Sequence, residues 1–371
     1  MSSRRDRDYV RDGKAFCDRY QFVKYLNEGA EGKISRWEAT DNGQLVAVKE
    51  AVRANRDDLK REAQAFIKIG EHPNIVNFFG YDPHWPVCPP ALFIEHADLG
   101  DVTDYRALIR ANGCDVAEVT LWKFLSDITQ ALDWIHNHLD EPCVHGDLKP
   151  GNILVMLPPD YDGGGIPLLP TFKICDVARL QPARKIGPVL RFDGTPEFGP
   201  PMAERRARIA PSVDIYAIGA SIQLFQLGIH PTMSKQDFIE TMKKAGVTPL
   251  PTERELNDPN HKWRFDMPPL YRPLNMPKEY QESVLKLKWP KPPVSNAFND
   301  WYSMTMEESP ARRISAKTLS KYFIPVSERQ VDLLSAKQIR EAALQQEQET
   351  AATIEKARMA RRQGREWKGQ A

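Results

Sequence analysis

The 371-residue chain has few of the features that mark a secreted, zinc-binding or membrane-spanning protein. Its five cysteines are scattered and form no Cys-x-x-Cys pair, which argues against a disulfide framework and a cysteine-ligated metal site. The longest apolar run, 215–229, is too short to cross a bilayer and contains two glutamines. The N-terminal residues lack the apolar core of a signal peptide. We therefore expect a soluble intracellular protein, cytoplasmic or nuclear.

An excess of charge of one sign is also missing. Lys and Arg number 51 and Asp and Glu 50, so the net charge of +1 supplies no general field for nucleic acid or an anionic membrane, and neither is expected as a partner. Proline, by contrast, is abundant: the chain has 30, and eleven of them lie in 231–293 among tryptophans and tyrosines. Prolines mixed with large aromatic residues predict ordered excursions from a core more than flexible linkers.

The first motif is a glycine hairpin followed by a strand that ends in lysine. Gly29 and Gly32, three residues apart, would let the backbone approach a phosphate, although most Gly-x-x-Gly hairpins are simple turns. The strand 46–49 then ends in Lys49, which can face such a phosphate. Glu62 lies in a charged stretch, 56–69, whose apolar residues recur at helical spacing. It is a candidate partner for Lys49, and the alternative is a solvent-facing helix charge.

The second motif concentrates a carboxylate, an ammonium group and an amide within six residues. Asp147, Lys149 and Asn152 are separated by proline and glycine, which predicts a loop, and an apolar strand follows. Asp176 ends another short apolar strand, 172–175. A carboxylate at a strand end is a suitable ligand for Mg²⁺, which prefers one or two carboxylates plus phosphate oxygens.

With these motifs in the same order along the chain, the sequence resembles the eukaryotic protein-kinase family, serine/threonine branch, over about residues 20–325. Its catalytic loop is a His-Gly-Asp variant. The resemblance implies an α+β fold of two lobes, a small β-rich N-lobe (19–97) with one regulatory helix and a larger, mostly α-helical C-lobe (98–325). Pro-rich insertions are expected at 158–170 and 231–293. A charged, flexible N-terminus (1–18) and a charged helical tail (326–371) would flank the two lobes.

The resemblance also implies ATP and Mg²⁺ as cofactors and assigns catalytic roles. Asp147 would orient the acceptor hydroxyl and accept its proton, and Lys149 would neutralise the migrating phosphoryl group. Lys49, held by Glu62, would contact the α- and β-phosphates. The implied Mg²⁺ ligands are Asn152 and Asp176. The residues implied to surround the nucleotide are Asn27, Gly29, Gly32, Ile34, Ala47, Lys49, the hinge residues Glu95, His96 and Ala97, Asp101 as a ribose ligand, and Leu154.

Departures from the family pattern concern regulation. Gly146 replaces the arginine that reads a phosphate on the activation loop, and residues 177–194 contain no Ser, Thr or Tyr. We therefore expect that activation-loop phosphorylation is not used.

Two further departures concern packing and pairing. Val177 and Ala178 replace Phe-Gly, and Met202 replaces a glutamate that the family pairs with a late arginine, here Arg313. Either Glu204 substitutes for that glutamate or Arg313 is more exposed than usual.

The leading functional hypothesis is phosphate transfer to Ser or Thr hydroxyls of protein substrates, because Lys149 and Thr195 together resemble the serine/threonine branch. A pseudokinase scaffold is the first alternative, with 231–293 or the C-terminal helix binding a protein partner. The second is a small-molecule phosphotransferase, since His145-Gly146-Asp147 followed by Asn152 also resembles aminoglycoside and choline kinases. The segment around Thr195, the helix start at Asp214 and Lys149 favour a protein substrate.

Overall fold

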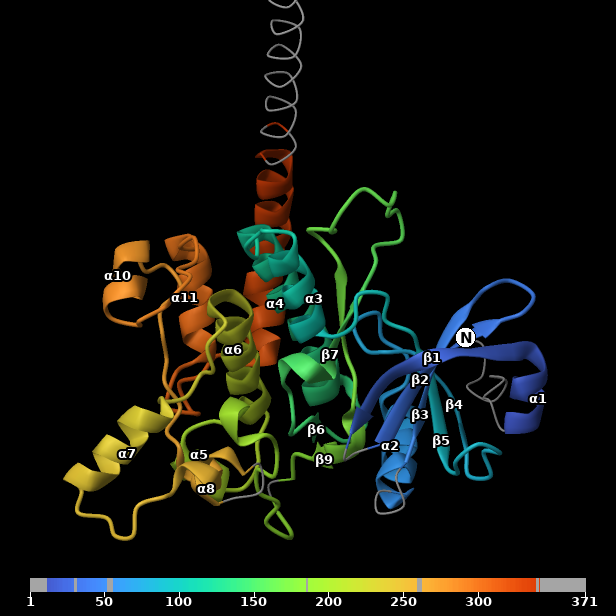
Figure 1. Ribbon diagram of the computed structural model, residues 1–371, viewed down its shortest axis with the longest axis horizontal. Helices are drawn as coiled ribbons and strands as arrows, with labels where there is room; N and C mark the ends of the chain where they lie inside the picture. Colours follow the sequence, from blue (N-terminus) through green and yellow to red (C-terminus); the bar gives the residue numbers. More distant parts are fainter. Residues whose placement is uncertain are drawn as a thin grey trace, which may run out of the picture. The chain divides into compact units, whose positions relative to one another are not determined.

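A computed structural model describes residues 12–29, 32–51, 56–184, 186–258, 262–337 and 340. The chain divides into two compact units, Met1–Ile324 and Pro325–Ala371. The first unit contains a β-rich lobe and a helical lobe, so the α+β two-lobed fold expected from the motifs is confirmed. Figure 1 shows the sheet, with α2 beside it, on one side of this unit and most of the other helices on the opposite side.

The β-rich lobe is a five-stranded antiparallel sheet in the order β1-β2-β3-β5-β4. Its core is largely aromatic, because the side chains of Phe16, Trp37, Trp85 and Phe93 meet at ring-centroid distances of 5.3–5.8 Å for their edge contacts. A single long helix, α2, connects β3 to β4 and packs against β4. The elements of this lobe are α1 (Gly13–Arg19), β1 (Tyr20–Gly29), β2 (Gly32–Ala39), β3 (Leu45–Glu50), α2 (Arg56–Ile69), β4 (Phe78–Asp82) and β5 (Ala91–Glu95).

The N-terminus differs from the flexible segment expected over 1–18. Residues 13–19 form α1, and its Phe16 is only 4% exposed and stacks on Tyr20 at 4.2 Å between ring centroids. The backbone N–H of Gly13 also donates to the Asp82 carboxylate at 2.8 Å. Although this stretch is charged, it contains Phe16, which packs into the core of the sheet. The expectation of a flexible segment was therefore wrong for residues 12–18. Residues 1–11 lie outside the described part of the chain.

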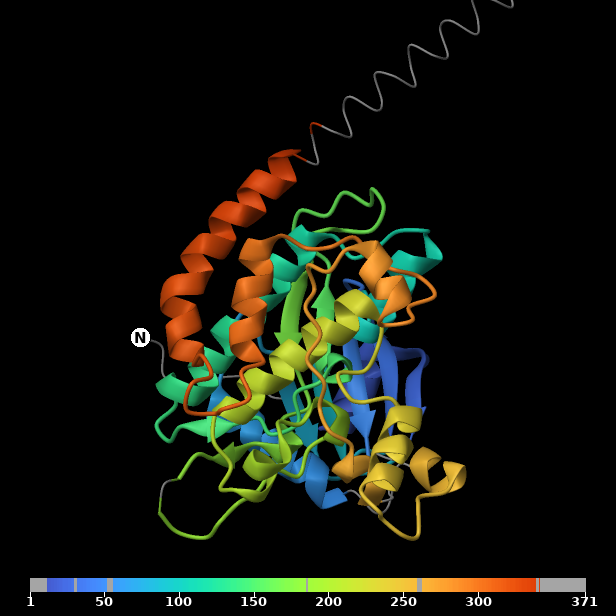
Figure 2. The same ribbon diagram turned by 90° about the vertical axis from the view of Figure 1, so that its left-hand side faces the viewer.

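The helical lobe is built around α6, a mostly apolar helix in which almost every residue is buried. Helices α4 and α11 pack against it, as Figure 2 shows from a view at right angles to Figure 1. At its C-terminal end α4 continues into a π-helical turn, Trp134–His138. The main helices of this lobe are α3 (Val102–Ala111), α4 (Glu118–Asp133), α5 (Met202–Arg206), α6 (Ser212–Leu227) and α11 (Asn296–Thr305).

Short strands and turns, which position the candidate site, lie between α4 and α5 in the sequence. Strand β7 pairs with β8, and β6 pairs with β9, both antiparallel. The loop 158–170 that joins β7 to β8 is fixed by side-chain bonds from Tyr105 and Thr120 to its carbonyls. These elements are β6 (Cys143–Val144), η3 (Pro150–Asn152), β7 (Ile153–Met156), β8 (Thr171–Ile174), η4 (Val177–Arg179), β9 (Gln181–Pro182) and η5 (Pro196–Phe198).

The described residues of the insertion 231–293, which are 231–258 and 262–293, have a small hydrophobic cluster of their own, in which Phe238, Leu256 and Met267 are buried. Its helix α9 contacts η5. Within the second unit, residues 325–337 and 340 are helical, and the rest of the expected helical tail lies outside the described residues. Among the described helices none is long and apolar enough to cross a membrane. The helices of the insertion are α7 (Lys235–Lys244), α8 (Glu253–Asn257), α9 (Lys262–Asp266) and α10 (Lys278–Ser283).

Candidate active site

Lys49 is held by two carboxylates. Its ammonium nitrogen lies 2.9 Å from Glu62 Oε2 and 3.2 Å from Asp176 Oδ1. The alternative of a solvent-facing charge is wrong for Glu62, because α2 turns this side chain inward, where it is 2% exposed. Burial opposes the charge on Lys49, but the carboxylates of Glu62 and Asp176 outweigh that effect and raise the pKa of the ammonium above its ordinary value. This lysine is therefore a fixed cation.

Asp176 follows β8 at a sharp backbone turn. Its φ of 55° and ψ of 62° lie in the left-handed region, which turns the chain from β8 into η4. Burial tends to raise the pKa of this carboxyl, yet Lys49 beside it lowers the pKa below the ordinary value. Asp176 is thus ionised at neutral pH and presents its carboxylate next to Lys49. The adjacent Cys175 is buried, and burial raises the pKa of its thiol, so it behaves as a small apolar side chain.

Asp214, at the first turn of α6, organises the loop that carries Asp147. Its carboxylate accepts the backbone N–H groups of His145 at 2.8 Å and Gly146 at 2.9 Å, and it contacts His136 Nε2 at 2.8 Å. Burial alone would raise the pKa of this carboxyl, but the bonds to His136 and the loop lower it below the ordinary value. From the sequence, Asp214 resembles the start of the helix that supports the catalytic loop, but its own bonds to that loop were not predicted. The available signal was a lone carboxylate at the start of a long apolar run.

Asp147 is the centre of a compact polar cluster. Its Oδ1 accepts the backbone N–H of Thr195 at 2.6 Å and the hydroxyl of Thr195 at 2.7 Å. Lys149 Nζ lies 3.3 Å from Asp147 Oδ2 and 3.1 Å from Thr195 Oγ1. Because these contacts join residues 46 and 48 positions apart, the segment after the activation loop is fixed directly to the catalytic loop. If the hydroxyl of another molecule took the place of the Thr195 hydroxyl, it would contact both the Asp147 carboxylate and the Lys149 ammonium group.

Asn152 completes the loop and tests whether a hard cation fits. Its Nδ2 donates to the carbonyl oxygen of Asp147 at 2.8 Å, which leaves the amide oxygen as the group available to a metal. That oxygen and the ionised Asp176 are both ligands that Mg²⁺ accepts. Among the residues that the structure describes, no group of three or more His, Cys, Asp or Glu side chains could hold an ion alone. The donor set fits an ion that completes its shell with phosphate oxygens and water.

The glycine hairpin needs glycine at its second position. Gly32 has φ of +145°, and a Cβ there would lie 2.2 Å from the carbonyl oxygen of Glu50 on β3. Gly29 pairs with Gly32 across the hairpin, whose tip residues 30 and 31 are outside the described ranges. Asn27 sits within β1, paired with Ile34, and is not among the residues with positive φ in the described chain. Asn27 therefore does not use the tolerance of left-handed conformations by which asparagine can replace a glycine.

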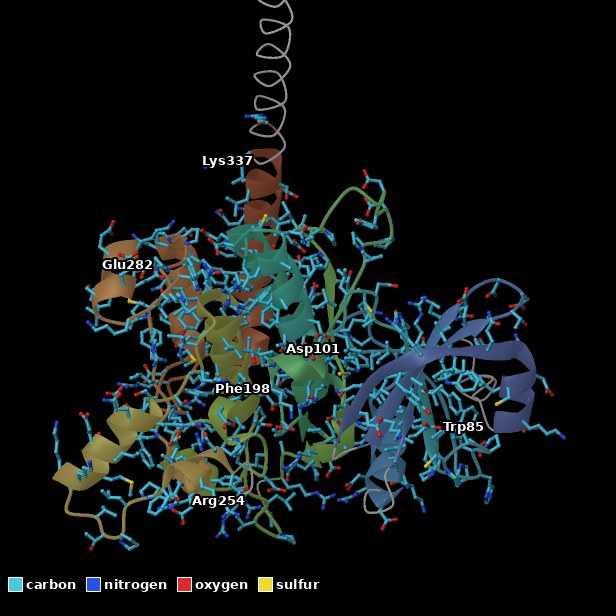
Figure 3. All side chains as sticks on the ribbon, viewed as in Figure 1. Trp85, Asp101, Phe198, Arg254, Glu282 and Lys337 are labelled. Atoms are coloured by element: carbon cyan, nitrogen blue, oxygen red, sulfur yellow. The ribbon has the colours of Figure 1, made fainter. Side chains whose placement is uncertain are left out.

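The residues expected to enclose an adenine come from β2, β3 and β7. Ala47 is buried on β3 and pairs with Ile94 of β5, directly before the hinge. Ile34 of β2 pairs with Lys49, and Leu154 of β7 forms a bridge with Asp101. Figure 3 shows Asp101 where the sheet and the helical lobe meet. Apolar side chains from both lobes are therefore available to a flat ring.

Two of the expected nucleotide ligands already have strong partners. The Glu95 carboxylate lies 2.7 Å from Lys173 Nζ and accepts the N–H of Asn77 at 3.1 Å, so this side chain is already engaged and an adenine edge would have to use the backbone of the hinge at this residue. Asp101 caps α3, where one carboxylate oxygen accepts the N–H groups of Thr103 and Asp104. A ribose contact by Asp101 would have to use its second oxygen.

The open question about Arg313 is answered by the structure. Its Nη1 lies 2.9 Å from both carboxylate oxygens of Glu204, which also accepts the hydroxyl of Ser212 at 2.6 Å. Arg313 is therefore buried and paired, and Glu204 takes the place that Met202 leaves empty. The sequence reasoning could not decide this because the two positions are only two residues apart.

The activation segment is held by contacts within the chain. Strand β9 pairs with β6, Ala183 N donates to Pro142 O at 2.8 Å, and Arg208 donates to the carbonyl oxygens of Arg184, Gly187 and Pro188. Gly146 has φ of +82°, and a Cβ there would lie 3.3 Å from the carbonyl oxygen of Arg179. An arginine at position 146 would thus be strained by the same packing that orders the segment.

A cavity of about 780 Å³ lies beside these groups, between α2, the catalytic loop and the activation segment. Its lining includes Lys49, Glu62, Asp147, Asp176, Arg179 and Arg191.

Comparisons with known proteins agree with this geometry. The family model for the protein kinase domain matches residues 20–323. The chain is similar to the serine/threonine-protein kinase PBS1 of Arabidopsis thaliana, with 26% identity over 263 residues that cover 67% of this chain and 54% of that protein. It is also similar to GRIK2 of the same plant (27% identity, covering 60% and 54%) and to the probable kinase nek2 of Dictyostelium discoideum (27%, covering 37% and 34%).

The chain spans about half or less of the length of these curated relatives. The family match, however, extends from the first strand of the sheet to the last helix of the first unit. It includes every residue of the site described above, and it confirms the resemblance inferred from the motifs. The chain belongs to the protein kinase family.

Proposed function

We propose that this protein transfers the γ-phosphate of Mg·ATP to Ser and Thr hydroxyls of protein substrates. The observation that carries the proposal is that two separate clusters are assembled at once, Lys49 with Glu62 and Asp176, and Asp147 with Lys149 and Thr195. A protein that only serves as a scaffold would not need both clusters of charged side chains to be assembled. ATP, when bound, supplies the phosphoryl group, and Mg²⁺ offsets the charge of its phosphates.

The residues of the chain would divide the work as follows. Lys49 would hold the phosphates, with Glu62 keeping its ammonium group in place. Asp147 would orient the incoming hydroxyl and take its proton, while Lys149 would neutralise charge on the transferred group. Asn152 and Asp176 would hold Mg²⁺. The hinge backbone and the apolar side chains of Ile34, Ala47 and Leu154 would bind the adenine.

We further propose that activity does not require activation-loop phosphorylation. Residues 177–194 contain no hydroxyl side chain, and Arg208 fastens this segment through carbonyl oxygens that are always present. Thr195, the first hydroxyl after the segment, is occupied by Asp147 and Lys149. Full activity of protein shown by mass spectrometry to be unphosphorylated would support this proposal, and an activating phosphate at Thr195 would contradict it.

The decisive experiment measures phosphate transfer to Ser, Thr and Tyr peptide libraries by the full chain with Mg·ATP. In Asp147→Asn the side-chain amide keeps one oxygen that can accept both hydrogen bonds from Thr195, so we expect the loop to stay folded. The carboxylate that would take the proton of the acceptor hydroxyl is lost. We expect kcat to fall by about 10²–10⁴-fold. Asp176→Asn should abolish transfer, and Asp160→Asn, in the exposed part of 158–170, is the matched control.

The same experiment separates the alternatives. No transfer to any peptide and no change in melting temperature with Mg·ATP would leave the scaffold hypothesis. Transfer to aminoglycosides or choline but not to peptides would favour a small-molecule phosphotransferase. Transfer to tyrosine alone would reject the serine/threonine assignment.

A further inference from the structure

The activation segment and the helix that follows it carry a local excess of positive charge. Residues 179–208 contain seven Lys or Arg and three Asp or Glu, an excess of four positive charges in a chain whose total is only +1. The rest of the protein is therefore slightly acidic. A positive surface of this kind, confined to one segment of an otherwise balanced chain, concentrates anionic groups near that segment.

Three of these arginines are brought together by the fold. Ile209 N donates to Leu190 O at 2.8 Å, so the stretches around 190 and 209 run side by side. Arg191 Nε then donates to Arg206 O at 3.2 Å, and the Arg208 guanidinium binds carbonyl oxygens of 184, 187 and 188. We call Arg191, Arg206 and Arg208 the basic rim.

The charge of the basic rim is not neutralised within the described part of the chain. Its hydrogen bonds go to backbone carbonyls, and no described carboxylate forms an ion pair with these three arginines. Their neighbours differ, because Arg184 pairs with Glu141 at 2.7 Å and Arg179 pairs with Asp193 at 3.2 Å. Arg191 and Arg206 are also exposed, so their guanidinium groups are accessible to a ligand.

The rim is close to the site where a hydroxyl would be phosphorylated. Arg191 and Asp147 line the same cavity. Arg191 is also only four residues from Thr195, which bonds to Asp147, so the Cα atoms of residues 191 and 195 are at most about 14 Å apart. That is the length of about four residues of an extended peptide. A substrate whose hydroxyl reaches Asp147 has flanking side chains within reach of the rim.

We propose that the basic rim selects acidic protein substrates, with Asp or Glu side chains within about four residues of the phosphorylated hydroxyl. This inference rests on the proposed kinase function and adds the substrate class. Each exposed pair between a rim arginine and a substrate carboxylate is expected to change kcat/KM by about two- to fivefold, and two pairs by about tenfold. The pairs are exposed, so the preference should weaken as salt is added.

The test uses three Ser peptides that differ only in four flanking residues, which are Glu, Gln or Lys. We expect wild-type kcat/KM to be at least tenfold higher for the Glu peptide than for the Lys peptide at low salt, and this ratio to fall at 0.5 M NaCl. The Arg191→Gln/Arg206→Gln variant should lower the ratio at least fivefold. Arg110→Gln, an exposed arginine at the end of α3, is the matched control and should keep it.

The ratio is the informative quantity, because purely structural damage would lower kcat/KM for all three peptides alike. Arg208 is left unchanged, since removing it would also release the activation segment. A binding measurement is independent of catalysis: fluorescence anisotropy of a labelled Glu peptide with Ala in place of Ser should show weaker binding to the double variant than to wild type.

The outcomes keep the two proposals apart. Equal or preferential use of the Lys peptide by an active enzyme would overturn the inference and leave the kinase function standing. Absence of transfer to every peptide would refute the proposed function. In that case, equal affinity of the Glu peptide for the wild type and for the double variant would also refute the hypothesis that the basic rim binds acidic peptides.

Discussion

The buried pair of Glu204 and Arg313 allows a prediction whose size can be worked from its contacts. In Glu204→Gln the Arg313 guanidinium, whose side chain is 0% exposed, loses its only described carboxylate partner. Removing one member of a buried ion pair costs about 3–5 kcal/mol. Arg313 also donates to the carbonyl oxygens of Ser212, Glu307 and Glu308 and lies 4.9 Å from the ring centroid of Tyr216. These neutral partners remain, so we expect a loss near the lower limit, about 3 kcal/mol.

The assay is equilibrium urea unfolding of the full chain, followed by tryptophan fluorescence and far-UV circular dichroism. Glu282→Gln is the matched control, because Glu282, labelled in Figure 3, is an exposed residue of α10, and this variant should stay within about 0.5 kcal/mol of wild type. Replacing both partners, as in Glu204→Leu/Arg313→Met, should cost less than Glu204→Gln, because no unpaired buried charge is left.

A second measurement tests the assignment of Glu204 itself. Met202→Glu restores the family residue but should add no stability, since Arg313 is already paired. A loss below about 1 kcal/mol for Glu204→Gln would refute the reasoning on burial. Recovery of stability in Met202→Glu/Glu204→Gln would show that position 202 can reach Arg313 after all.

Three further predictions concern the catalytic loop and its neighbours. Gly146→Arg should lower both the melting temperature and kcat, because of the positive φ and the contact with the Arg179 carbonyl; Gly113→Arg, at φ of +72° in open space, isolates the cost of the backbone. Asp214→Asn should lose about 2–3 kcal/mol at pH 7 in urea unfolding, since one buried N–H loses its acceptor. The pKa of Asp214 is lowered from 3.8, so its stabilisation is present above about pH 4 and is lost as the pH falls through the lowered value; the wild-type and Asn curves should therefore converge below pH 4, and parallel curves would contradict the assignment. Inhibitors that require residues 176–178 to turn outward should bind about fivefold more tightly to Ala178→Gly than to wild type, by calorimetry, because glycine adopts positive φ more cheaply; equal affinities would count against this.

Much of the site could be predicted from sequence because its parts are local. Asp147, Lys149 and Asn152 lie within six residues, and their spacing by proline and glycine predicts the loop that presents them. The helix 56–69 was predicted from its apolar spacing and has the expected bounds, α2. One apolar residue of this helix, Ile67, is nevertheless 60% exposed, because the buried face of α2 follows Leu59, Glu62 and Phe66. The spacing of apolar residues cannot predict that a charged residue, Glu62, lies on the buried face of the helix.

The sequence by itself determined which chemical groups this protein offers: two lysines and three carboxylates proposed for catalysis, a glycine hairpin, and an activation loop without hydroxyls. Only the tertiary structure decided which of them meet. Lys49 and Asp176 are 127 residues apart and come from different lobes, and Glu204 and Arg313 are 109 residues apart within the helical lobe, so both pairings depend on tertiary packing and not on any local pattern. The same holds for the basic rim. Composition shows an excess of arginine over 179–208, but the bonds that bring Arg191 and Arg206 together beside the catalytic loop exist only in the folded chain.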